Sequence, residues 1–117
     1  MKVIKIDSLK KEVSVIEIDG SLESIYKELN CTMIEAPIVL DNEDTLYVDA
    51  EGLFVSEAKG GFMFSIYHSP YMGNGLIIGS NDEGENIDVQ STLEDIKNKV
   101  TFLPSETCEY ILKRFQA

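Results

Sequence analysis

The chain is poor in the side chains on which metal sites, disulfide frameworks and acid–base catalysis depend. It has one histidine, His68, and two cysteines, Cys31 and Cys108, which lie far apart and outside any metal-ligand spacing. Two unpatterned cysteines are typical of free thiols in a reducing compartment. No HExxH or CxxC pattern surrounds His68, and no nucleophile-elbow sequence accompanies it. We therefore expect no cofactor, no metal and no enzymatic activity.

Long apolar stretches are also missing. No run approaches the ~18 apolar residues that a membrane-spanning helix needs. The N-terminal MKVIKID is typical of a short strand rather than of a signal peptide. A chain of 117 residues with 44% apolar side chains has the size of one globular domain, residues 1–117, with a single core. The sequence thus predicts a cytoplasmic protein of one domain that does not bind membranes.

Positive charge is scarce. The 10 lysines and arginines stand against 21 aspartates and glutamates, which gives a formal net charge of −11. This charge opposes direct binding to the nucleic-acid backbone and to anionic membranes. It suits a basic protein partner or mimicry of nucleic acid, and a merely solvated acidic surface explains it equally well.

One stretch, residues 58–81 (AKGGFMFSIYHSPYMGNGLIIGSN), contains no acidic side chain. This acid-free window holds five of the eight glycines, four of the ten aromatic residues, and Lys59 as its one full positive charge. An anion or another protein can approach such a region without repulsion. Burial of a hairpin explains the same composition, because protein cores exclude carboxylates.

Two motifs in the window have both a functional and a structural interpretation. The aromatic side chains can stack on a planar ligand, or pack in a core or a dimer interface; they are Phe62, Phe64, Tyr67 and Tyr71. The glycine motif, residues 73–75 followed by Gly79, matches neither the P-loop nor the dinucleotide-binding pattern. It predicts a tight turn with Asn74 or Gly75 at positive φ, whose backbone amides remain available to an anion.

Hydrophobic periodicity predicts an α+β fold, a mostly antiparallel sheet with two or three helices packed against it. The expected strands are 2–7, 12–19, 31–40, 45–49, 76–79 and 87–89, and the expected helices are 22–29, 93–100 and 105–115. Residues 53–69 fit either a strand or a helix. The apolar parity shifts between Val15 and Ile16, which indicates either a bulge or a strand buried on both faces. Pro37 indicates an edge strand or a break.

The most regular helical pattern lies in residues 22–29. Its apolar residues follow the i, i+3, i+4, i+7 spacing of one helix face; they are Leu22, Ile25, Tyr26 and Leu29. We expect this face to pack on a sheet containing Ile4, Ile6, Ile16 and Ile18, with the helices on one face of the sheet. Ser91 and Glu94 have the spacing of a capping box for the second helix. The acidic turns 41–44 and 82–88 lack the calcium-loop register, and we expect both to be solvated.

Four segments, MKVIKID, IEIDGSLESIYKELNC, TLYVDAEGL and GNGLIIG, give the chain a family resemblance. In that order they resemble an uncharacterised domain-of-unknown-function family of small proteins from phages, prophages and mobile elements of bacteria. The resemblance covers residues 1 to about 100 and leaves the final helix unmatched. It implies a phage protein in the cytoplasm of a bacterial host, where such proteins often counter host defence by binding. It carries over no catalytic residue.

In that setting, we hypothesise that the protein binds and sequesters a small nucleotide-type signal without changing it. A lysine would meet a phosphate, an aromatic ring would stack on the base, and an asparagine would fix its polar edges. The expected ligand-binding residues are Lys59, Tyr67, His68, Tyr71 and Asn74.

We also expect a homo-oligomer, most simply a homodimer, because the window's apolar residues exceed what so small a domain readily buries. The alternative function is that of an acidic protein that binds and inhibits a basic host defence protein or mimics nucleic acid.

Overall fold

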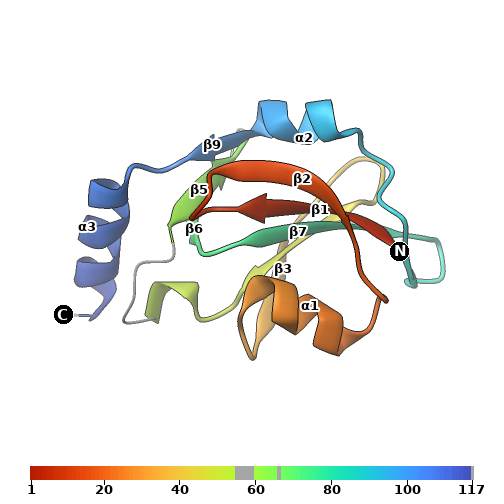
Figure 1. Ribbon diagram of the computed structural model, residues 1–117, viewed down its shortest axis with the longest axis horizontal. Helices are drawn as coiled ribbons and strands as arrows, with labels where there is room; N and C mark the ends of the chain where they lie inside the picture. Colours follow the sequence, from red (N-terminus) through yellow and green to blue (C-terminus); the bar gives the residue numbers. More distant parts are fainter. Residues whose placement is uncertain (55–59, 66, 117) are drawn as a thin grey trace.

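The structure, a computed structural model, describes residues 1–54, 60–65 and 67–116, and at residues 54, 67, 68, 115 and 116 it describes the backbone alone. Two antiparallel sheets form its framework (Figure 1). The larger has six strands in the order β2-β1-β7-β4-β3, with β8 beside β7. Its strands are β1 (Lys2–Asp7), β2 (Glu12–Glu17), β3 (Ile34–Val39), β4 (Thr45–Asp49), β7 (Gly75–Ser80) and β8 (Asn86–Ile87).

The smaller sheet has three strands in the order β6-β5-β9. They are β5 (Gly61–Phe64), β6 (Tyr67–Met72) and β9 (Val100–Phe102). The helices are α1 (Leu22–Leu29), α2 (Leu93–Lys99), α3 (Ser105–Gln116) and the 3₁₀ turn η1 (Gly52–Phe54). The α+β class predicted from the sequence is confirmed. The ambiguous segment 53–69 contributes η1, β5 and the start of β6, while residues 55–59 and 66 lie outside the described residues.

Strand β7 lies at the centre of the larger sheet. It pairs with β1 on one side and with β4 on the other. Leu76, Ile77 and Ile78 are fully buried, and they alternate between the two faces of the sheet. A strand covered on both faces has a continuous apolar sequence rather than an alternating one, which explains why this segment was predicted correctly.

The helices lie on both faces of the larger sheet, so the expectation of helices on one face is wrong. Ile4 and Ile6 face α2 and the smaller sheet, in a cluster that contains Ile96. Ile16 and Ile18 pack on the opposite face with Ile25 of α1. Figure 1 shows the sheet between α2 above and α1 below.

The parity shift in β2 is explained by this two-sided core. Val13 packs with the α2-side cluster and Ile16 with the α1-side cluster. The pairing of β1 with β2 runs without a register shift, so β2 contributes side chains to both faces and has no bulge. The opposite edge strand, β3, contains Pro37 and a register shift between Glu35 and Ile38, as the proline indicated.

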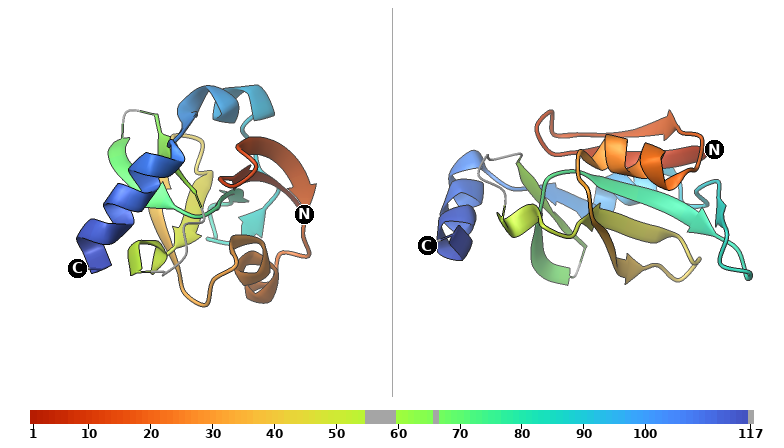
Figure 2. Two further views of the ribbon diagram at one scale, coloured as in Figure 1. Left: turned by 60° about the vertical axis from the view of Figure 1, so that its left-hand side comes forward. Right: turned by 90° about the horizontal axis from the view of Figure 1, so that it is seen from below.

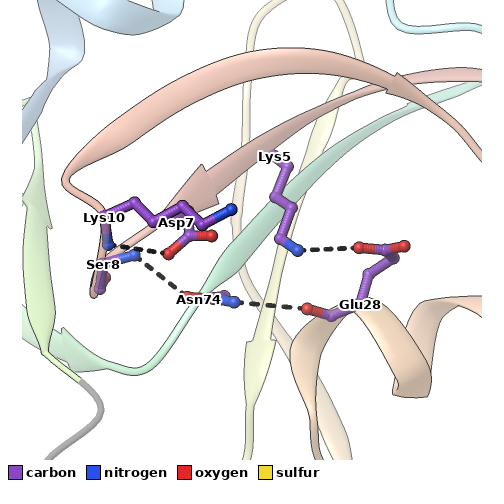
Figure 3. A network of polar contacts seen from close by, with 6 residues as sticks. All are labelled: Lys5, Asp7, Ser8, Lys10, Glu28 and Asn74. Atoms are coloured by element: carbon purple, nitrogen blue, oxygen red, sulfur yellow. Dashed lines mark hydrogen bonds and ion pairs between the residues drawn. The ribbon is translucent and has the colours of Figure 1, made fainter.

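Helix α1 begins and ends at local signals in its sequence. The Ser21 side chain accepts a hydrogen bond from the Ser24 N–H (3.1 Å), and Asn30 ends the helix with a left-handed φ of 51°. Both are common capping solutions. The Lys5 ammonium and the Glu28 carboxylate, 2.9 Å apart, tie the helix to β1 (Figure 3). Ile25 is 2% exposed whereas Leu22 is 52% exposed, so the buried face is narrower than predicted.

Replacing Ile25 with alanine should lower the free energy of unfolding by roughly 2–4 kcal/mol, because the cavity forms against a packed sheet. The matched control is Leu22→Ala on the same helix, which should change it by less than about 0.5 kcal/mol. Reversible urea denaturation measures both. Equal effects of the two substitutions would contradict the observed orientation of α1.

The start of α2 differs from the prediction. Thr92, not Ser91, caps the helix, and its Oγ1 accepts from the Asp95 N–H (3.2 Å). The Ser91 N–H instead donates to the carboxylate of Asp44 (2.7 Å). The helix ends at Lys99 and Val100 begins β9, a strand that the helical pattern concealed.

Asp44 joins the β3–β4 turn to the segment before α2. Its side chain is fully buried and accepts from the backbone N–H groups of Gln90 (3.1 Å) and Ser91 (2.7 Å). The Asn42 side chain adds a hydrogen bond to the Ser91 Oγ (3.0 Å). The expectation that residues 41–44 form a solvated turn is therefore wrong for Asp44, whose charge is met by donors inside the structure.

Asp44→Ala should lower the free energy of unfolding by roughly 1–3 kcal/mol, because two backbone N–H groups lose their acceptor. Asp41→Ala in the same turn removes an exposed carboxylate and should change it by less than about 0.5 kcal/mol. Guanidinium denaturation of the three proteins tests this. A tolerated Asp44→Ala would show that the turn and α2 are held together by packing alone.

Candidate functional site

A pocket of about 330 Å³ lies where the edge of the larger sheet meets β6 of the smaller one. Strands β3 and β4, the segment through η1, and β6 each contribute to its lining. The lining residues are Glu35, Pro37, Val48, Asp49, Ala50, Gly52, Leu53, Ser69, Pro70, Tyr71 and Met72. We call this the β3–β6 pocket.

Three contacts, one of them between backbone atoms, hold the walls of the β3–β6 pocket. The Asp49 carboxylate accepts from the Glu51 N–H (2.8 Å) and turns the chain from β4 into η1. At Gly52, a β-carbon would lie 2.7 Å from the Met72 carbonyl oxygen, so only glycine lets η1 approach β6 this closely. On the other side, the rings of Tyr71 and Phe62 pack at 5.6 Å between centroids, which holds Tyr71 against the smaller sheet.

The chemistry of the β3–β6 pocket suits a cation. Glu35 and Asp49 are its two acidic lining residues, and Pro37, Val48 and Met72 bring apolar surface. Glu35 pairs with Val48 and shares its face of the sheet, whereas Asp49 pairs with Ile34 on the other face. Among the described residues, no lysine, arginine or histidine lines it. A positively charged group would gain from the Glu35 carboxylate, whereas a phosphate would be repelled by it.

The structure brings only part of the predicted nucleotide site together. Tyr71 lines the β3–β6 pocket. Tyr67 and His68 lie in the same strand, β6, but the structure describes only their backbone, and Lys59 lies outside the described residues.

Asn74 lies apart from the pocket lining, in the turn between β6 and β7 (Figure 3). Both ends of its side-chain amide make hydrogen bonds within the protein. Its oxygen accepts from the Ser8 N–H (3.1 Å), and its nitrogen donates to the Glu28 carbonyl (3.4 Å). The amide thus links the β1–β2 turn to the end of α1. The residue with positive φ in this turn is Gly73 (91°), so the expectation of Asn74 or Gly75 there is wrong.

The family model of a domain of unknown function, DUF3846, matches residues 1–115. The chain belongs to this family. The match extends beyond residue 100 and includes α3, which the resemblance had left unmatched. No curated protein and no solved structure matches the chain. Within the described part of the chain, no helix is long and apolar enough to cross a membrane.

In this member of the DUF3846 family, much of the acid-free window is core. Phe62 and Phe64 are fully buried, in the cluster that also contains Ile77. A β-carbon at Gly75 would lie 2.8 Å from the Phe62 Cζ, so the ring rests on the backbone of β7. For these two aromatic residues, core packing is the correct interpretation. Burial also removes the reason given for a homo-oligomer, although the oligomer itself stays a prediction.

Two further hollows of about 430 Å³ each adjoin the β3–β4 turn and share Asp41 and Asn42. One contains Lys99 beside Asp95, and the other is lined by Glu43 and Asp82. No group of three or more potential metal ligands occurs among the described residues.

The thiol of Cys108 offers no nucleophile. Burial raises its pKa, which keeps it protonated near neutral pH and therefore poorly reactive.

Sequence reasoning missed Glu35 and Asp49. Their neighbours in the chain are ordinary strand residues, and these two residues line a pocket only because β6, more than 15 residues away in the sequence, closes it. The one available signal was Pro37, which indicated an edge strand. Among the described strands, no further strand pairs with β3 on its outer side.

Proposed function

We propose that this protein is a non-enzymatic binding module for a basic protein, and that the β3–β6 pocket receives a lysine or arginine side chain of that partner. The observation that carries the proposal is the lining of this pocket, which has two acidic residues, Glu35 on the same face as Val48, and no described cationic residue. This is the alternative function derived from the sequence.

The shape of the pocket fits such a side chain. Lysine and arginine bury their aliphatic stems on apolar surface while the charged end seeks an anion. Pro37 and Val48 supply apolar surface beside Glu35, and Tyr71 supplies an aromatic ring that attracts cations through its face. At longer range, the net charge of −11 draws a basic partner toward the protein.

A counter-defence role supplies the biological setting. The sequence resemblance supports an origin in a phage or mobile element, and a bacterial host's cytoplasm as the place of action. A basic host defence protein held at the pocket would be blocked by occupancy, without any reaction.

The nucleotide hypothesis remains as a second prediction, since the side chains of Lys59, Tyr67 and His68 lie outside the described part of the structure. In the β3–β6 pocket itself, a phosphate about 4 Å from a carboxylate would meet about 4 kcal/mol of repulsion at an effective dielectric constant of roughly 20. Geometry therefore favours the basic partner.

Calorimetric titration distinguishes the two functions. An arginine-rich peptide should bind, and its affinity should fall as salt is added, because exposed charges are screened. Cyclic and linear signalling nucleotides, titrated in the same buffer, should give no binding heat. Nucleotide binding without peptide binding would reverse the assignment.

Glu35→Gln tests the pocket directly. Because exposed ion pairs contribute up to about 1 kcal/mol, we expect the peptide affinity to fall roughly two- to fivefold. The matched control is Glu12→Gln, which makes the same charge change on β2, at the opposite edge of the larger sheet. Equal losses in both variants would mean that the net charge, not the pocket, selects the peptide.

A further inference from the structure

The described strands end in four sheet edges, and three of them are blunted. The larger sheet ends at β2 and β3, and the smaller at β6 and β9. Pro37 and a register shift interrupt β3, Pro70 and a register shift interrupt β6, and β9 has only three residues. Proteins commonly protect exposed edges in these ways.

The fourth edge, β2, has none of these protections. It has six residues without proline or glycine, and its register with β1 is regular. Figure 2 (right) shows β2 as the outermost strand at the upper rim of the molecule. A regular, open edge offers its backbone to another strand.

The hydrogen bonds of the N-terminus show which β2 residues direct their backbone outward. Met1 and Ile18 exchange both backbone hydrogen bonds, at 2.9 and 3.0 Å. In an antiparallel pair such bonded positions alternate, so Val13, Val15 and Glu17 direct their N–H and C=O groups away from β1.

The behaviour of Lys2, which lies opposite Glu17, agrees with this alternation. Its backbone bonds Asp88 and Val89, on the side away from β2. Among the described residues, the outward groups of β2 have no hydrogen-bond partner.

We propose that a second copy of this chain occupies this edge, through antiparallel pairing of β2 with β2 about a twofold axis at Ser14. In this register the outward groups of Val13 meet those of Val15 of the partner subunit, twice by symmetry. The two larger sheets then form one continuous sheet. Val15 is 48% exposed in the single chain, and the pairing covers it with another valine, a favourable cross-strand combination.

The charges at this edge also favour a second copy over a basic peptide. In the Ser14-centred register, Lys11 faces Glu17 of the partner subunit, and Glu12 faces Ile16 of the partner subunit. No two carboxylates are therefore directly opposed. Two directly opposed carboxylates would weaken the pairing. Lys10 and Lys11 precede β2 and Lys2 lies opposite Glu17, so this edge does not select a basic strand as the β3–β6 pocket does.

Val15→Pro tests the interface without breaking the β1–β2 ladder, because the N–H that it removes points outward. Sedimentation velocity at micromolar concentration should show a dimer for the wild type and a monomer for the variant, with similar thermal midpoints. The matched control is Val39→Pro. The Leu40 N–H bonds Asp44 across the β3–β4 hairpin, so the N–H of the preceding Val39 also points outward at an exposed edge, and this variant should remain dimeric.

Ser14→Cys tests the register. In the Ser14-centred pairing this residue faces its own symmetry mate at the short Cα separation of a non-hydrogen-bonded pair, within reach of a disulfide. In a Cys31→Ser background, mild oxidation should give a covalent dimer on a non-reducing gel. Glu12→Cys in the same background faces Ile16 of the partner subunit and should not crosslink.

A wild type that sediments as a monomer at every concentration overturns the proposal, as does a dimer that is unaffected by Val15→Pro. Salt distinguishes this inference from the proposed function. Two chains of charge −11 repel each other, so added salt should strengthen the dimer, whereas it should weaken the binding of an arginine-rich peptide.

Discussion

Burial of β7 on both faces is the constraint on which the other elements depend. Its three central side chains are fully buried and alternate between two clusters, so one layer must cover each face. Helix α1 covers one, and α2 with the smaller sheet covers the other. The glycines at the ends of the strand permit this close approach. At Gly75 the Phe62 ring rests on the backbone, and at Gly79 a β-carbon would collide with the Asp88 carbonyl.

Two polar side chains hold the connections around this core. Asp44 fixes the segment before α2, and Asn74 links the β1–β2 turn to α1. Each meets backbone groups that would otherwise be desolvated without a partner, which is the condition under which a polar group contributes to a fold. The remaining carboxylates lie largely at the surface. Among the described residues, Glu28 alone forms an ion pair, with Lys5, so the acidic surface keeps most of its charge available to a partner.

The two proposed interaction surfaces use different physics and lie at opposite edges of the larger sheet. The β3–β6 pocket offers the Glu35 carboxylate beside apolar surface, and β2 offers backbone groups in a regular strand. One partner is selected by charge and the other by hydrogen-bond register. A dimer through β2 would leave both β3–β6 pockets on its outer ends, where each remains accessible.

Local patterns in the sequence were sufficient for the elements whose cause is local. The 3.6-residue periodicity and the Ser21 cap defined α1, the apolar run defined β7, and Pro37 marked β3 as an edge. Local patterns failed where contacts with residues far away in the sequence determine the structure. Ser91 lost its capping role because the Asp44 carboxylate, 47 residues away, takes its N–H. Val100 continued a helical pattern but pairs with Phe64 in a sheet.

The acid-free window is the clearest example of what the sequence alone determined. Its composition showed correctly that carboxylates are excluded from residues 58–81, and two of its aromatic side chains proved to be excluded from water as well. The candidate pocket lies partly outside the window, at Glu35 and Asp49, because a pocket is formed by segments that meet only after the chain folds. The sequence determines the hydrophobic periodicity and the charge of each segment. The proximity of β3, β4 and β6 arises only when the two sheets pack together. The tertiary structure therefore decided which acidic residues of this protein line a pocket.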